Sequence, residues 1–109
     1  MASDPATVAF AVRQMQGAGL LRHARMFGEY GIWCDGKLVA LVCDDQLFLK
    51  PTAGAMALMA DLPTGPPYAG ARPMVIGDAL LDDPDRLARV VAQIAADLPE
   101  LKPKKPRKT

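Results

Sequence analysis

The stretch MFGEYGIWCDGKLVALVCDDQLFLK, residues 26–50, decides the fold of this chain. At its centre is the pair Asp35-Gly36, which suits a type I′ hairpin turn because that turn needs positive φ at both central positions. The runs on either side are rich in β-branched and aromatic residues, which favour strands. A second turn follows at Asp44-Asp45. The stretch therefore predicts three antiparallel strands joined by two tight turns.

The two turns also set the strand registers, and side chains along a strand alternate between two faces. With Asp35 and Gly36 as the loop residues, Cys34 lies opposite Lys37 and Tyr30 lies opposite Leu41. One predicted face is almost wholly apolar, and we expect helices to cover it. That face carries Phe27, Glu29, Gly31, Trp33, Leu38, Ala40, Val42, Leu47 and Leu49.

The other predicted face has five apolar residues beside a rim of Lys37, Gln46 and Lys50. The five are Tyr30, Ile32, Val39, Leu41 and Phe48. A solvated sheet face of a monomer is more polar than this. We therefore predict that these five residues form an interaction face. A protein partner, a second copy in a homodimer, or the chain's own loop at residues 61–70 with Tyr68 could cover it.

The rest of the chain predicts helices before and after these strands. Ser3 or Asp4 can cap a first helix with Pro5 in its opening turn, and Thr52 can cap a short helix that ends near residue 60. Residues 61–70, rich in proline, predict an irregular loop. Residues 72–76 predict a strand that pairs with residues 79–81 through a turn at Gly77-Asp78.

A last helix is predicted from Asp82 or Asp83 to Pro99, because its apolar residues recur at i, i+3, i+4 and i+7. The element order is then α-β-β-β-α-β-β-α. Grouped strands favour an α+β fold, here two layers with an antiparallel five-stranded sheet and helices on one face.

A length of 109 residues predicts one domain, which we place at residues 1–98. Residues 99–109 have little to bury and predict a disordered tail. Its basic residues are Lys102, Lys104, Lys105, Arg107 and Lys108. A mildly acidic body with a basic tail does not fit a domain that grips a DNA duplex with a basic face. The tail could still bind nucleic-acid phosphates weakly and without sequence preference, or simply aid solubility.

Two cysteines, Cys34 and Cys43, lie about 20 Å apart in the predicted hairpin at 3.3 Å per residue, too far for a disulfide. Free thiols indicate a reducing compartment. With no signal peptide and no apolar run of membrane-spanning length, we expect a cytoplasmic protein without membrane contact.

The residues of the opening stretch resemble the signature of the TfoX/Sxy family, N-terminal domain, whose bacterial members are linked to the regulation of natural competence. The resemblance covers about residues 8–98 and continues weakly through residues 67–73 and 81–84. It is carried by Met26-Phe27-Gly28, Tyr30-Gly31, Asp35-Gly36-Lys37, Asp44-Asp45 and Leu47-Phe48-Leu49-Lys50.

This resemblance implies a two-layer α+β domain similar to type III secretion chaperones, and it supplies no known reaction. The segment at residues 73–81 is shorter than in longer members of the family. We expect a stand-alone domain without the C-terminal TfoX domain of full-length members.

Residues that could perform catalysis are few. Ser3 is the only serine and His23 the only histidine, and no cysteine or histidine pair has metal spacing. A dyad of His23 with Cys34 or Cys43 is formally possible, but small thiols in a sheet are more often simply buried. We expect no enzyme activity, catalytic site, metal or cofactor.

The sequence thus predicts a non-enzymatic regulatory domain that binds a protein, with a role in competence or transcription implied by resemblance alone. The alternative is a nucleic-acid-associated accessory protein that uses its lysine-rich tail.

Overall fold

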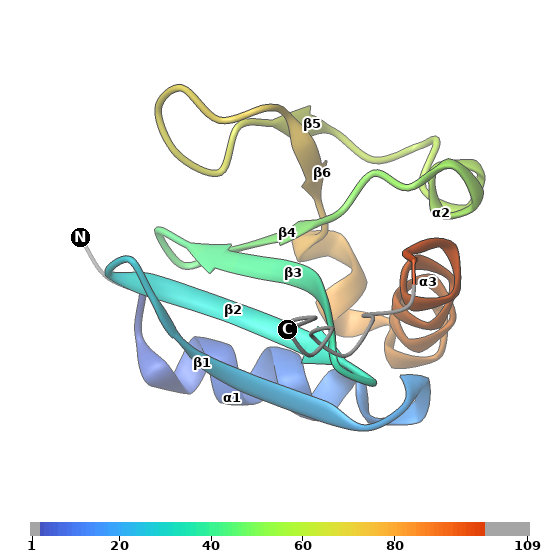
Figure 1. The fold of residues 1–109 in the computed structure, drawn as a ribbon, viewed down its shortest axis with the longest axis horizontal. Helices are drawn as coiled ribbons and strands as arrows, with labels where there is room; N and C mark the ends of the chain where they lie inside the picture. Colours follow the sequence, from blue (N-terminus) through green and yellow to red (C-terminus); the bar gives the residue numbers. More distant parts are fainter. Residues whose placement is uncertain (1–2, 100–109) are drawn as a thin grey trace, which may run out of the picture.

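The computed structural model describes residues 3–99, and the basic residues predicted to contact nucleic acid, Lys102, Lys104, Lys105, Arg107 and Lys108, lie outside this range. Six strands form one antiparallel sheet in the order β1-β2-β3-β4-β6-β5 (Figure 1). The strands are β1 Leu21–Met26, β2 Glu29–Cys34, β3 Lys37–Cys43, β4 Gln46–Leu49, β5 Thr64–Gly65 and β6 Met74–Ile76. The helices are α1 Pro5–Gln14, α2 Ala53–Leu58 and α3 Pro84–Asp97, with short 3-10 helices η1 Gln16–Ala18 and η2 Asp78–Asp82. The predicted α+β class is confirmed.

The sheet has six strands where five were predicted. A turn at Phe27-Gly28, with φ of 51° and 84°, separates β1 from β2, whereas the sequence interpretation placed Gly28 inside a strand. Phenylalanine is uncommon at a left-handed position, so the pair gave no turn signal.

The C-terminal strands also differ from the prediction. β5 lies in the segment predicted to be irregular, and residues 79–81 belong to η2 rather than to a strand. η2 buries Leu80 in the core. The predicted Gly77-Asp78 hairpin was therefore wrong, while β6 lies within the predicted strand at residues 72–76.

The two predicted hairpin turns are confirmed. Asp35 and Gly36 have φ of 52° and 83°, and Asp44 and Asp45 have φ of 54° and 60°. Positive φ at both central residues is the requirement of a type I′ turn. Cys34 accordingly pairs with Lys37, and Cys43 pairs with Gln46.

A β-bulge changes the faces that the sequence predicted. Trp33 pairs with Leu38, but Ile32 pairs with Ala40, so Val39 is an extra residue on β3. Beyond the bulge every side chain of β3 points to the opposite face from the one that strict alternation gives. Val39 and Ala40 are therefore both fully buried in the core.

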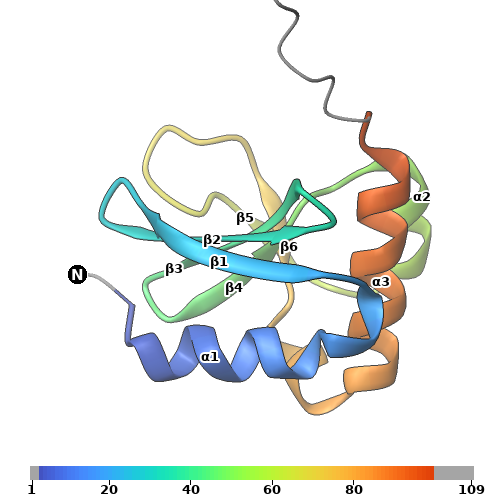
Figure 2. The ribbon, with the colours of Figure 1, turned by 60° about the horizontal axis from the view of Figure 1, so that its bottom comes forward.

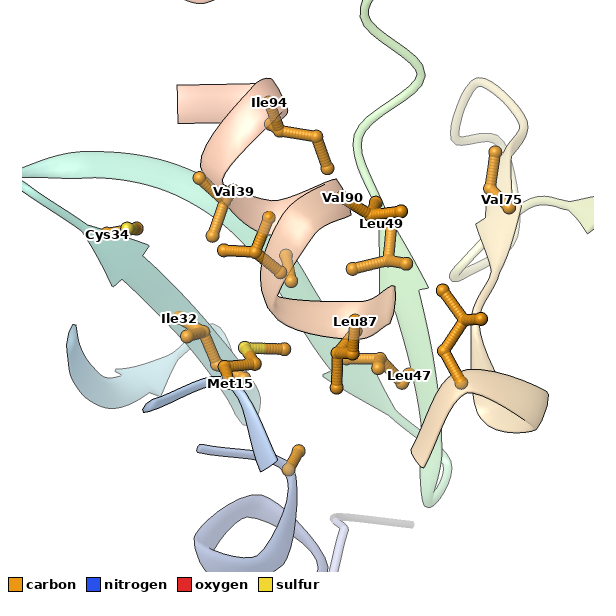
Figure 3. Packing of buried hydrophobic residues seen from close by; sticks show 14 of the residues in the cluster. Met15, Ile32, Cys34, Val39, Leu47, Leu49, Val75, Leu87, Val90 and Ile94 are labelled. Atoms are coloured by element: carbon orange, nitrogen blue, oxygen red, sulfur yellow. The ribbon is translucent and has the colours of Figure 1, made fainter. Parts of the chain in front are cut away.

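The helices α1 and α3 cover one side of the sheet, which we call the helix face (Figure 2). Met15 lies near Ile32, and the α3 residues Leu87, Val90 and Ile94 lie over β3 and β4 (Figure 3). α2 joins this core through Ala55. The core thus lies between the sheet and the helices, in two layers.

Polar contacts fix the helix ends. The Asp4 carboxylate accepts a hydrogen bond from Ala6 N–H at 2.9 Å, and Asp83 accepts one from Arg86 N–H at 3.3 Å, as expected for N-caps. The Asp97 carboxylate in α3 accepts hydrogen bonds from Gly54 and Ala55 N–H at the start of α2.

The side chain of Lys37 caps the C-terminal end of α3. Lys37 Nζ donates to the carbonyl oxygens of Ala95 at 2.8 Å and Leu98 at 3.1 Å. A cation at a helix C-terminus is favourable because the last carbonyls are unpaired and carry partial negative charge. Lys37 was predicted at the rim of an interaction face, and it instead joins the sheet to α3.

Candidate functional site: a groove on the outer face

On the side of the sheet away from α1 and α3, which we call the outer face, no helix of residues 3–99 lies over the strands. Its apolar residues come from β2, β3, β4 and β6. They are Trp33, Leu38, Leu41, Cys43, Phe48, Met74 and Ile76. The loop between β5 and β6, residues 66–73, and the hairpin tip at residues 26–29 both project on this side (Figure 2).

Two adjoining hollows form one groove across the outer face. The first has a volume of about 600 Å³ and lies between the hairpin tip and Tyr68. The second has a volume of about 430 Å³ and continues past Tyr68 to Arg72 and Pro73. Both hollows are lined by Leu41, Pro67 and Tyr68. Leu41 belongs to the central strand β3, so the groove lies across the middle of the sheet.

Two aromatic side chains project at the rims of the groove without being buried. Phe27 is 99% exposed and Tyr68 is 62% exposed. Phe27 also has φ of 51°, a left-handed conformation that costs a non-glycine residue about 1 kcal/mol or more. Strain of this kind, with no packing of the side chain to offset it, is found most often at functional sites.

The two ends of the groove carry opposite charge. Glu29 and Asp44 line the first hollow, and Lys50 and Arg72 line the second. Partial burial alone would raise the pKa of Glu29, but hydrogen bonds from Asp44 N–H and from Ser3 outweigh it and leave the pKa below its usual value. Glu29 is therefore ionised at neutral pH.

Neither cysteine is placed for nucleophilic chemistry. Both thiols are free and buried. Burial raises the pKa of Cys43, and the charges of Glu29 and Asp44 raise it further. Burial and the charge of Asp35 likewise raise the pKa of Cys34. A protonated thiol is a poor nucleophile.

His23, the histidine weighed for catalysis, does not line the groove. His23 is exposed on the edge strand β1, and no hydrogen bond joins it to either thiol within residues 3–99. Within the same residues, no group of three or more His, Cys, Asp or Glu could hold a metal ion. The Asp44-Asp45 and Asp82-Asp83 pairs serve in a turn and at a helix start.

The five residues of the predicted interaction face do not share one face. Tyr30, Ile32 and Val39 lie in the core under the helices, and Tyr30 is only 7% exposed. Leu41 and Phe48 lie on the outer face. The grouping was wrong because the bulge at Val39 moves Leu41 to the face opposite Tyr30 and Ile32.

Residues that the sequence interpretation assigned to the core complete the outer face. The Trp33 ring lies over Gly31, where a Cβ atom would be only 2.9 Å from ring atom Cη2. The Arg22 guanidinium lies 4.3 Å from the centre of the Trp33 ring, a cation–π contact. Gly31 thus allows a close approach of the Trp33 ring, and it lies on the outer face.

Fold and groove together define a class: a small α+β domain whose antiparallel sheet has helices on one face and an apolar groove on the other. A model of the TfoX N-terminal domain matches residues 13–97, and the chain belongs to this family. The family resemblance found in the sequence is confirmed.

A relative in Spirochaeta aurantia, described as an uncharacterized 12.7 kDa protein in the trpE 5′ region, is 35% identical over 105 residues. The match covers 96% of this chain and 91% of that protein. Among the helices of residues 3–99, none has the length and apolar character needed to cross a membrane.

Proposed function

We propose that this chain is a regulatory protein-interaction domain, which binds a protein partner in the groove of the outer face. The proposal extends the competence-related association of the TfoX N-terminal domain family to this chain. It rests above all on Phe27, an exposed aromatic side chain held in a strained turn at the rim of an apolar groove.

The chain's own loop at residues 66–73 covers only part of the outer face. Pro67 in the loop at residues 66–73 is buried, and so are Phe48 and Met74 beside it on the sheet. Tyr68 nevertheless stays largely exposed, and the groove on both sides of it is accessible. Exposed aromatic residues around a pocket are typical of the positions that carry most of the energy of a protein interface.

The chemistry of the groove favours binding over catalysis. Its walls are mainly apolar, and the thiol of Cys43 is kept protonated by burial and by two carboxylates. The remaining charged groups lie at opposite ends of the groove, where they can orient a partner. Such an arrangement confers specificity on a complex.

The test places a photoreactive phenylalanine analogue at Phe27 or Tyr68, in cells that naturally contain the protein. A matched control carries the analogue at Arg89, an exposed position on α3. We expect one discrete polypeptide adduct from positions 27 and 68 and none from position 89. An adduct of twice the chain mass would identify the partner as a second copy.

The purified partner should then bind the native chain, and Phe27→Asn should weaken binding by tenfold or more, as measured by calorimetry. No polypeptide adduct from the groove positions, or equal adducts from all three, would refute the proposal.

A further inference from the structure

The groove lies on the face of a paired sheet, and this limits what can occupy it. Building on the function proposed above, we propose that the occupant is an amphipathic α-helix of the partner. Its N-terminus lies toward Glu29 and Asp44, and its C-terminus lies toward Lys50 and Arg72.

The backbone hydrogen bonding of the sheet favours a helix over an extended peptide. Leu41, at the floor of the groove, pairs with Gly31 on β2 and with Phe48 on β4, so β3 offers no free row of donors and acceptors. An extended peptide laid on this face would bury backbone groups without partners, at considerable cost. A helix satisfies its own backbone and presents only side chains.

The layers of the domain also favour a helix on the outer face. The sheet already has helices on one face, and the uncovered face is apolar across β3, β4 and β6. A sheet with an apolar second face is stably covered by another helical layer. Leu41 in the floor, with Phe27 and Tyr68 at the rims, suits an apolar stripe at i, i+3 or i+4, and i+7.

The charges at the two ends of the groove set the direction of the helix. Asp44 follows the end of β3, and Lys50 N–H donates to the carbonyl of Val39, so the two charged ends are separated by about five strand residues, or roughly 16 Å. A helix covers that distance in about eleven residues, or three turns. Its N-terminus carries partial positive charge and its C-terminus partial negative charge, which match the acidic and basic ends.

The test uses two stapled, fluorescently labelled 14-residue helical peptides with the same composition and the same leucine and phenylalanine stripe. One has two lysines in its first turn and two glutamates in its last turn, and the other has these charges exchanged. Fluorescence anisotropy with the purified chain should show that the peptide with N-terminal lysines binds at least fivefold more tightly at low salt.

The preference should depend on the charges at the groove ends. We expect it to fall below twofold in the double variant Asp44→Asn/Arg72→Gln. The matched control Asp82→Asn/Arg89→Gln removes one charge of each sign away from the groove and should keep the full preference. Salt at 1 M should reduce the preference as well, because it screens exposed charges.

Several results would overturn the inference. They are a preference for the exchanged peptide, equal binding of both peptides, or tighter binding of an extended peptide that carries proline and the same apolar residues. Binding of neither peptide, while positions 27 and 68 still crosslink to a partner, would refute the helix and leave the proposed function standing. Mapping that crosslink to a non-helical segment of the partner would do the same.

Discussion

The strain at Phe27 predicts that a substitution at an exposed aromatic residue stabilises the fold. Phe27 occupies the first central position of the β1–β2 turn at φ 51°, where Asn is much better tolerated than a bulky residue. Since the ring is 99% exposed, its removal costs almost no packing. Phe27→Asn should therefore raise the free energy of unfolding by about 1 kcal/mol, the approximate strain of a left-handed non-glycine residue.

Urea unfolding followed by the fluorescence of Trp33, the single tryptophan, measures this change. With a slope of about 1–2 kcal/mol per molar urea, the midpoint should rise by roughly 0.5–1 M. The melting temperature should rise by about 4–8 °C for a domain of this size. The matched control is Asp44→Asn, because Asp44 holds the same turn position at φ 54° and already tolerates it. That control should change stability by less than about 0.5 kcal/mol.

If the strained turn serves binding, one substitution should change both stability and partner binding, whereas a turn with only a structural role would affect stability alone. Phe27→Asn should stabilise the chain and at the same time weaken partner binding, a trade-off expected where strain is kept for function. A midpoint that falls, or that stays within error of the native value, would refute the reasoning, since it would mean that the ring packs against the fold or that the turn is relaxed.

Three further predictions concern the fold. Lys37→Met should cost about 1 kcal/mol in urea unfolding because it removes the charge-assisted cap of α3, whereas Lys50→Met should cost little. The pKa of Glu29 is lower in the folded chain than its usual 4.5, so its contribution is full above that pH and is lost as the pH falls through the folded pKa. In the Glu29→Gln variant, the urea unfolding midpoint should therefore fall less steeply as the pH is lowered below about 4.5. Gly77→Ala should cost about 1–3 kcal/mol, because its Cβ would lie 2.6 Å from Leu49 Cδ1 in the core, and an unchanged midpoint would contradict this packing.

Local turn chemistry was readable from the sequence, and it carried most of the correct predictions. Asp35-Gly36 and Asp44-Asp45 use residues that tolerate positive φ, so both turns and the registers next to them were predictable. Helix caps were predictable for a different reason, because the short carboxylates of Asp4 and Asp83 accept hydrogen bonds from N–H groups of the first helical turn. The turn at Phe27-Gly28 was missed because phenylalanine gives no such signal.

The assignment of side chains to the two sheet faces failed because one inserted residue reverses the face of every side chain that follows it in the strand. Strict alternation grouped Leu41 with Tyr30 and Ile32, but the extra residue at Val39 puts Leu41 on the opposite face from these two, while Val39 and Ala40 are both in the core. Valine and alanine in succession are compatible with a bulge or a regular strand. β4 was predicted correctly because the Asp44-Asp45 turn lies beyond the bulge and sets its register independently.

The groove itself depends on contacts between distant parts of the chain, and this explains why its residues were not grouped in advance. Phe27, Leu41 and Tyr68 come from a hairpin tip, a central strand and a proline-rich loop, and the loop is positioned only because β6 pairs with β4. A fold gains nothing from an exposed aromatic residue in a strained conformation, which is why Phe27 is the main support for the proposed partner.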